Sequence, residues 1–422
     1  MSETTTSVDA QREARNARIA ARLKKRYAAE KRFKYLAMGS VIFSALVLAF
    51  LLFVMTSNGI AGFARAEMRV PVDFAAAWLT IDETRLSQPG AQSALESAGL
   101  ADILQFSATE AYGQDAADEL NAAAWRNLAD QLIADPEMLR GEQTVSVPVS
   151  EDLASGMRGE GAAEMRVLAD RLQAEGALYR AVDWGFLSRA DATNSQQAGI
   201  WGALKGSLLT MVVTLALAFP IGVLSALYLE EYAPRNKWTD IIEVSINNLA
   251  AVPSIIFGLL GLAVFLAIFP NYRSAPLIGG MTLALMTMPV IVISGRNAIK
   301  AVPPSIRDGA LAIGASKVQV VFHHVLPLAL PGILTGTIIG MARALGETAP
   351  LLMIGMRAFV ATPPDGFTSP SSVLPVQIFL WSDEINRGFV ERTSAAIIVL
   401  LVFLLLMNGL AIYLRNRFER RW

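Results

Sequence analysis

Residues 318–342 read VQVVFHHVLPLALPGILTGTIIGMA, an uninterrupted run without Asp, Glu, Lys or Arg. A helix rises about 1.5 Å per residue, so about 20 apolar residues cross the roughly 30 Å hydrocarbon core of a bilayer. Five further charge-free runs are also long enough to cross it. They are Tyr35–Ala64, Gly206–Leu229, Val244–Tyr272, Ser274–Gly295 and Thr393–Leu414. The sequence therefore predicts an all-α polytopic membrane protein with six transmembrane helices.

The composition supports this fold class. Of 422 residues, 53% are hydrophobic and 17% are charged, and the mean hydropathy is +0.42. These values exclude an ordinary soluble protein and a disordered chain. The sequence has no cysteine, which excludes disulfides and thiolate chemistry. It also lacks the Gly-x-x-x-x-Gly-Lys-Ser/Thr, Gly-x-Ser-x-Gly and His-Glu-x-x-His motifs, so we expect no enzyme, and no metal or cofactor bound by this chain.

The charge distribution predicts the orientation. Residues 1–35 form a basic tail with ten Lys and Arg against four acids, and a first transmembrane helix follows at 36–57. Positive residues stay cytoplasmic, so we expect the N-terminus inside, with the tail as a solvated or membrane-surface helix that binds no nucleic acid. Six spans return the C-terminus to the same side, where the final segment, RNRFERRW from Arg415, carries four Arg. The alternative for the first span is a signal cleaved near Ala64-Arg-Ala66.

Residues 58–195 form a domain that we expect to be periplasmic and mostly helical. It contains 22 acids, 10 Arg and no Lys. Apolar residues near a spacing of 3.6 predict its helices, and alternating residues predict a short strand at 144–149, which Pro148 confines to a sheet edge. The predicted helices are 91–108, 116–134 and 152–179. The residues indicate no catalytic or metal-binding group here, and the role of this domain stays open.

The remaining residues, 196–422, form a five-helix membrane domain. We place the fifth span of the chain, which is the fourth helix of this domain, at about 329–354. Small residues four apart lie on one helix face and allow another helix to approach closely. This ridge consists of Gly332, Gly336, Gly340 and Ala344. At 100° per residue, Arg343 and Glu347 fall on the ridge face, so we expect both charges to point into the protein and lie deep in the membrane.

A charge inside a bilayer costs several kcal/mol unless it is paired or lines a watery cavity. Arg343 and Glu347 either form a salt bridge that only locks helices together, or line and gate a polar translocation pathway to which Thr348 adds a hydroxyl. The fork of an Arg side chain suits an oxyanion. Arg296, at the cytoplasmic end of the fourth helix, is either a membrane-boundary anchor or a second pathway residue.

The cytoplasmic loop 302–327 separates the fourth and fifth helices. Pro304 suits the first turn of a helix, Gly314 interrupts it, and Ser316 can cap a second helix that we expect to stop at Pro327. Two short helices with a glycine bend can project into the cytoplasm or lie on the membrane surface.

This loop resembles the coupling motif of ABC-importer permeases, in which a Glu-Ala-Ala triplet is followed by Gly four residues later and by an Ile-x-Leu-Pro ending. The residues that match are Asp308, Gly309, Ala310, Gly314, Leu326 and Pro327. Asp and Gly replace the first two residues of the triplet, and His324 replaces the Ile of the ending, while the spacing is intact. The segments Arg343–Pro350, Val252–Leu259 and Gly206–Thr210 are similar to segments of the PstA-type permease subunits of phosphate ABC importers. The resemblance covers about residues 200–420.

The resemblance implies one N-terminal helix plus a five-helix permease core in the cell inner membrane, in contact with membrane lipid. It implies a second homologous permease subunit, two ATPase subunits that hold ATP-Mg and dock on the coupling loops, and a periplasmic phosphate-binding protein. ATP binding and hydrolysis in the ATPases would drive alternating access for inorganic phosphate. Two alternatives remain at this point: an ion-coupled secondary transporter of an oxyanion, and a membrane-anchored sensor or scaffold.

Overall fold

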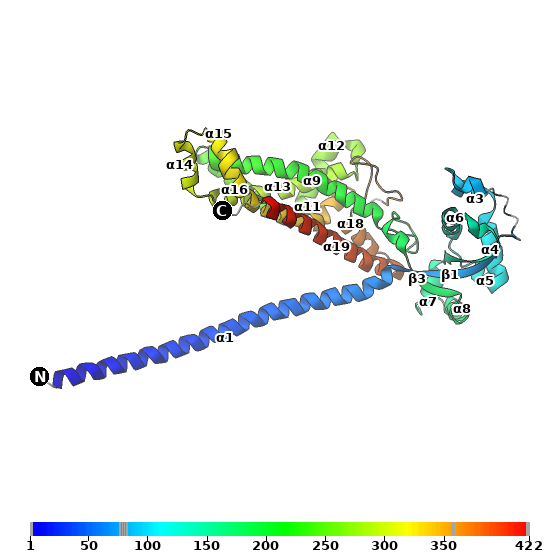
Figure 1. Ribbon diagram of the computed structural model, residues 1–422, viewed down its shortest axis with the longest axis horizontal. Helices are drawn as coiled ribbons and strands as arrows, with labels where there is room; N and C mark the ends of the chain where they lie inside the picture. Colours follow the sequence, from blue (N-terminus) through cyan, green and yellow to red (C-terminus); the bar gives the residue numbers. More distant parts are fainter. Residues whose placement is uncertain are drawn as a thin grey trace. The chain divides into compact units, whose positions relative to one another are not determined.

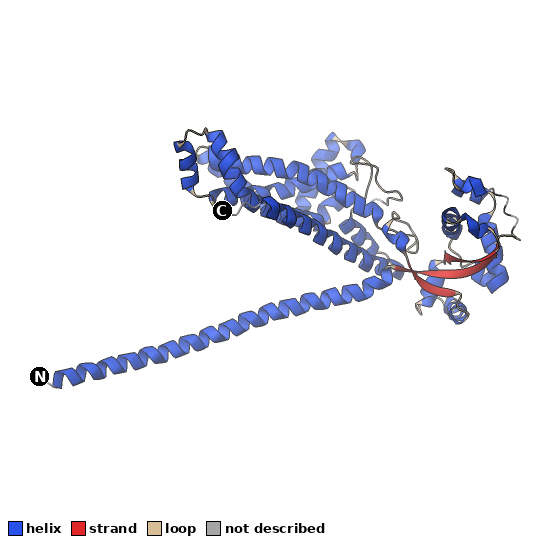
Figure 2. Cartoon of the chain, viewed as in Figure 1, coloured by secondary structure: helices blue, strands red, loops and turns tan. Residues whose placement is uncertain are grey.

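The computed structural model describes residues 3–75, 77, 79, 81, 83–356 and 359–418, so the last four residues of the predicted basic C-terminal end lie outside the described residues. The chain forms two compact units, Met1–Ser57 and Asn58–Trp422. Helix α1, Glu3–Gly62, contains the predicted basic tail and first span, and its part Arg26–Gly62 is long and apolar enough to cross a membrane. Figure 2 shows that helices dominate and that the few strands lie together.

Three antiparallel strands form the centre of residues 64–195, which we call the sheet domain. They are β1 (Ala64–Asp73), β2 (Glu142–Pro148) and β3 (Leu178–Val182), in the order β2-β1-β3. The predicted strand is confirmed and lies at the edge. The central strand β1 was not predicted, and it contains the alanines of the alternative cleavage site. Met68 pairs with Val147 on one side and Leu178 on the other, while Pro71 pairs only with β2, so its missing N–H breaks no ladder.

Short helices cover this sheet. They are α2 (Glu83–Leu86), α3 (Ala91–Ser97), α4 (Leu100–Tyr112), α5 (Gln114–Ala117), α6 (Ala124–Ala134), α7 (Glu151–Met157) and α8 (Ala163–Ala174), with 3-10 turns at Pro136–Leu139 and Trp184–Leu187. The three long helices predicted here are divided. Gly99 and Gly176 have φ of 81° and 72°, a left-handed conformation that ends a helix, and β3 replaces the end of the third predicted helix.

The membrane domain contains the other predicted spans. Its helices begin with α9 (Trp201–Leu227), α10 (Lys237–Ala250), α11 (Ser254–Leu260), α12 (Leu266–Ile268) and α13 (Pro276–Lys300), with π-helical turns at Tyr228–Tyr232 and Gly261–Phe265 and a 3-10 turn at Pro270–Tyr272. It continues with α14 (Pro304–Ala312), α15 (Lys317–Gln319), a π-helical segment Val320–Val325, α16 (Leu326–Gly346), α17 (Ala349–Met353), α18 (Leu374–Ser382) and α19 (Arg387–Phe418).

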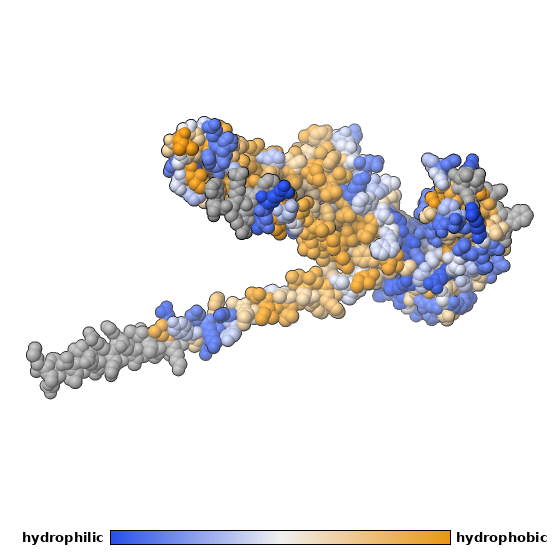
Figure 3. Space-filling view, in the orientation of Figure 1, coloured by the Kyte–Doolittle hydropathy of each residue, from blue (hydrophilic) through white to orange (hydrophobic). Residues whose placement is uncertain are grey.

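Within the described residues, five helical segments are long and apolar enough to span a membrane, and the pair formed by α10 with α11–α12, bent by 103°, makes a sixth if it crosses as one unit. This agrees with the predicted polytopic all-α fold. Hydrophobic side chains dominate the surface over these helices, whereas hydrophilic ones dominate the sheet domain (Figure 3).

Helix α13 is the centre of the membrane domain, packed between α9 and α16. Glycines permit these close approaches, since a Cβ added at Gly280 would lie 2.4 Å from the Val213 Cβ of α9. An aromatic cluster joins the sheet domain to the membrane helices, because the ring of Phe186 lies 6.2 Å from that of Trp381 in α18 and Trp381 lies 6.0 Å from Phe389 in α19. The sheet domain is therefore packed onto the membrane domain.

Candidate translocation site

The fifth span ends earlier than the sequence predicts. The span runs over Lys317–Gly346, and Glu347, at the C-cap of α16, has an extended backbone with φ −79° and ψ 119°. Thr348 then caps the separate helix α17. The continuous helix expected to about residue 354 is therefore wrong, and so is the placement of Arg343 near the middle of the span. Arg343 lies in the last turn of α16.

Arg343 and Glu347 form an ion pair across this helix end. Arg343 Nε lies 3.4 Å from Glu347 Oε1, and the two side chains are 49% and 19% exposed. The predicted burial of both charges is wrong for Arg343, because the buried arc of α16 centres on residues such as Gly336, Gly340 and Ala344, and Arg343 lies at its edge. A half-exposed guanidinium on a transmembrane helix requires water or a protein partner around it.

A second helix break precedes α11. Helices α10 and α11 are separated by residues 251–253, and Pro253 is the N-cap of α11. Helix α11 packs on α17, and a Cβ added at Gly258 would lie 2.6 Å from the Cα of Pro350. Discontinuous membrane helices expose helix ends and unpaired backbone groups, which transporters use to hold solutes. The helix that follows the second break therefore packs on the helix that follows the Arg343–Glu347 pair.

The glycine ridge of α16 packs against α13. A Cβ added at Gly336 would lie 1.8 Å from Ser294 Oγ, one at Gly340 would lie 2.9 Å from Thr287 Cγ2, and one at Gly332 would lie 2.7 Å from Ala298 Cβ. Ala344, the last residue of the ridge, is fully buried. The ridge thus holds α16 closely on α13, and this contact fixes the helix that carries Arg343.

Arg296 takes part in a cluster of ion pairs that the sequence did not reveal. Its Nη2 lies 2.8 Å from a Glu243 carboxylate oxygen in α10, its Nε lies 3.4 Å from Glu230, and its side chain is 13% exposed. Arg307 in α14 makes a similar contact, 2.7 Å from Glu231, and donates to the carbonyl of Val302. These two arginines attach α13 and the coupling loop to the end of α9. The glutamates in α10 and after α9 escaped prediction because they lie 53 and 76 positions away in sequence from the arginines that they contact.

The coupling loop has the predicted helix–glycine–helix form. Pro304 is in the first turn of α14, Gly314 has φ +89°, and Ser316 forms a capping box with Gln319. Asp308, Gly309 and Gly314 are exposed and Ala310 is buried, while Leu326 and Pro327 are partly buried. The loop lies at one end of the helix bundle (Figure 1). Exposed apolar side chains accompany it, namely Leu311, Ile313, Val318 and Phe322.

Pro327 does not stop the helix, contrary to the sequence prediction. It lies in the first turn of α16, directly after the π-helical segment Val320–Val325. Proline lacks an N–H and clashes with the carbonyl four residues earlier in a regular helix. The wider π-helical turn removes that conflict, so the chain continues from α15 into α16.

Two known protein families match separate parts of this chain. A family model described as "Binding-protein-dependent transport system inner membrane component" matches residues 203–421. A model described as "Domain of unknown function (DUF3333)" matches residues 20–166, which include most of the sheet domain.

Individual relatives match the membrane domain. The probable ABC transporter permease protein YqgI of Bacillus subtilis is 32% identical over 197 residues, which are 46% of this chain and 66% of that protein. The phosphate transport system permease protein PstA 1 of Mycobacterium tuberculosis is 30% identical over 229 residues, 54% of this chain and 74% of that protein. PstA of Yersinia pestis is 30% identical over 228 residues, 54% of this chain and 75% of that protein.

Proposed function

We propose that this chain translocates inorganic phosphate. It belongs to the family of binding-protein-dependent transport system inner membrane components. It is therefore the permease subunit of an ABC importer and not an enzyme. The phosphate permeases among its relatives, at about 30% identity, support this substrate. The Arg343–Glu347 pair carries the proposal physically. An Arg fork donates two parallel hydrogen bonds to an oxyanion, and the neighbouring carboxylate holds that fork when no anion is bound.

The partners follow from the exposed groups. The half-exposed Arg343 calls for a second, homologous permease subunit that encloses the pathway with it. The exposed apolar residues of the coupling loop suit an ATPase subunit that holds ATP-Mg, with a second ATPase on the second permease. A phosphate-binding protein delivers the substrate at the opposite face. The chain then lies in the inner membrane with both termini cytoplasmic and the sheet domain periplasmic.

The test measures uptake of radiolabelled phosphate into cells that express the whole importer. Arg343→Ala should lower uptake about ten- to hundredfold, because a hydrogen bond to a charged group contributes about 1.5–3 kcal/mol. Thr348→Val should lower uptake less, and Arg417→Ala, at the exposed opposite end of the membrane domain, is the matched control. Excess sulfate should not compete.

Uptake near the wild-type level in an assembled Arg343→Ala importer would exclude a pathway role for the pair. Competition by sulfate as strong as by unlabelled phosphate would exclude phosphate as the specific substrate while leaving the importer assignment intact.

A further inference from the structure

Arg392, in the second turn of α19, is a charged side chain that the proposed pathway does not use. The residue is 2% exposed. Each guanidinium nitrogen donates one hydrogen bond: Nη1 to the carbonyl of Gly62 at 2.8 Å, Nη2 to Asp183 Oδ2 at 2.8 Å and Nε to the carbonyl of Ser195 at 2.9 Å. The guanidinium also lies 5.0 Å from the ring centre of Phe186. All four partners belong to the sheet domain or its edges, so one membrane-helix side chain is surrounded by that domain.

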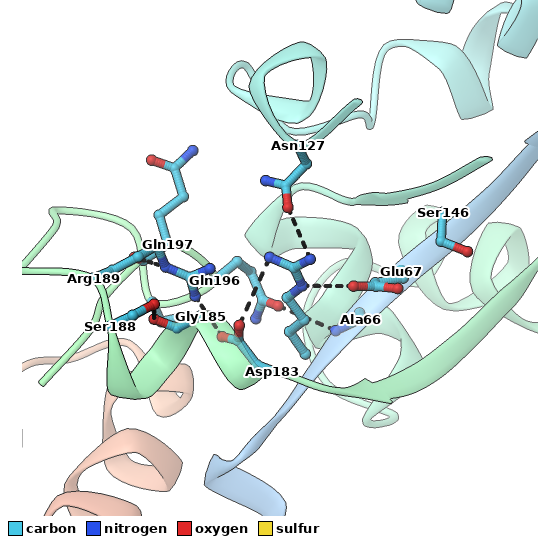
Figure 4. Close-up of polar contacts among 12 residues, drawn as sticks. Ala66, Glu67, Asn127, Ser146, Asp183, Gly185, Ser188, Arg189, Gln196 and Gln197 are labelled. Atoms are coloured by element: carbon cyan, nitrogen blue, oxygen red, sulfur yellow. Dashed lines mark hydrogen bonds and ion pairs between the residues drawn. The ribbon is translucent and has the colours of Figure 1, made fainter. Parts of the chain in front are cut away.

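Asp183 connects the Arg392 side chain to the sheet. The same Oδ2 accepts a hydrogen bond from Arg189 at 2.6 Å, and Oδ1 lies 3.8 Å from Arg65 of β1. Arg65 in turn pairs with Glu67 at 2.7 Å. Figure 4 shows Asp183 between Arg189 and the strand that carries Glu67. Separating α19 from the sheet domain would leave a buried charge without its partner, so the two parts are expected to move together.

A second layer of contacts surrounds the buried pair. Arg180 of β3 lies 3.0 Å from Glu391, and Arg387 lies 2.5 Å from Glu160. Gly388 has no side chain at the point where Ser195 approaches, since an added Cβ would lie 2.9 Å from Ser195 Cβ. The first turns of α19 are therefore enclosed by the sheet domain on several sides.

Helices α18 and α19 connect this junction to the candidate translocation site. Trp381 of α18 donates a hydrogen bond to Asp191 at 3.0 Å, and the backbone N–H of Leu374 donates to Ser207 of α9 at 2.8 Å. Helix α19 packs along both α18 and α16. A displacement of the sheet domain therefore reaches the helix that carries Arg343 through packed elements.

We propose that Arg392 is a positioning residue that fixes the sheet domain to α19, so that contact of the solute-binding protein with this domain is transmitted to the translocation helices. This proposal rests on the proposed function, because it takes the binding protein to be a partner of the complex. The domain carries 22 acids against 10 Arg, so the binding protein's contacting surface is expected to be basic.

The test compares ATP hydrolysis by the reconstituted importer complex with and without substrate-loaded binding protein. Arg392→Met should leave the basal rate within twofold of wild type and lower the stimulation by binding protein at least tenfold, and Arg392→Lys should keep more of the stimulation than Met. Stimulation within twofold of wild type would overturn the proposal. An equal fall of the basal and stimulated rates would also overturn it, because it would show a structural role only.

An engineered disulfide provides a second, independent test of the proposal. The chain has no cysteine, so Ser195→Cys with Gly388→Cys creates a single possible pair across the junction. The two Cβ atoms would lie 2.9 Å apart, so the backbones must separate by about 0.6 Å to reach the lower end of the usual Cβ–Cβ spacing of a disulfide. In the Arg392→Met background, stimulation of ATP hydrolysis by the binding protein should be at least fivefold higher with the disulfide oxidised than with it reduced. The disulfide also keeps the junction closed if the Arg392→Met complex alone fails to assemble. Equal stimulation in the oxidised and reduced states would refute the coupling. Failure of phosphate uptake with binding-protein stimulation intact would refute the substrate alone.

Discussion

Replacing Gly336 by alanine tests the close contact between α16 and α13. The added Cβ would lie 2.2 Å from Ser294 Cβ, far inside the 3.4 Å at which ordinary contact begins, and 1.8 Å from Ser294 Oγ. Because Cβ atoms are fixed to the backbone, a new rotamer can move the Oγ but not the Cβ, and the helices must separate. Overpacking of this kind costs about 1–3 kcal/mol.

The structure also predicts the compensating change. Ser294→Gly removes both clashing atoms and leaves its Cα at 3.7 Å, an ordinary contact distance, from the new methyl group. The double variant should therefore regain most of the lost stability, with a coupling energy of about 1–3 kcal/mol. Gly409→Ala is the matched control, since it adds the same methyl group to a transmembrane helix at a position with nothing within 4 Å.

The assay is thermal unfolding of the purified chain in nanodiscs. A loss of about 1–3 kcal/mol corresponds to a fall in Tm of roughly 2–12 °C for a domain of this size. Gly409→Ala should not lower Tm, because its methyl group enters open space and Ala favours a helix interior over Gly. A Tm for Gly336→Ala equal to that of the control, or a loss that persists in the double variant, would refute the packing argument.

Two further substitutions probe the loops. Gly314→Ala places a side chain in a left-handed conformation at a cost of about 1–2 kcal/mol, although the space around the new methyl group is open. This variant should lower recovery of the ATPase in co-purification. Gly309→Ala, the control, should not lower it. Burial raises the pKa of Asp191, so the folded state binds its proton more tightly, and the contribution of Asp191 to stability falls as pH rises above the ordinary value of 3.8. Asp191→Asn keeps an acceptor for Trp381, so it should raise Tm at pH 8 and make no difference near pH 3.5; an equal effect at both pH values would contradict the titration.

The membrane spans could be predicted because one requirement, an apolar and charge-free run long enough to cross the bilayer, determines their sequences. A charge-free run long enough to cross a bilayer has few uses outside a membrane, and the apolar stretches around Ser274–Gly295 and Thr393–Leu414 correspond to α13 and α19. The end of α16 was not predictable to the same degree. The π-helical segment before Pro327 lets the span begin earlier, next to the loop 302–327. No simple residue spacing predicts a π-helical turn.

The paired groups were harder to predict than the helices. Arg343 and Glu347 are four residues apart, so their pairing follows from local geometry. Arg392 and Asp183 are 209 positions apart, and Arg296 and Glu243 are 53 apart. Only the packing of distant segments brings such charges together. The strands β1 and β3 were missed for a related reason, since each is stabilised by a partner strand and not by its own residues.

The wide turn at Val320–Val325 has a geometric effect on the loop that precedes it. A π-helical turn contains one residue more than the regular repeat, so everything before it is rotated by about 100° about the axis of α16, relative to an uninterrupted helix. One additional residue therefore determines the direction in which the exposed Ile313 points. A chain of equal length with a regular α-helix at this place would present the proposed docking surface in a different direction.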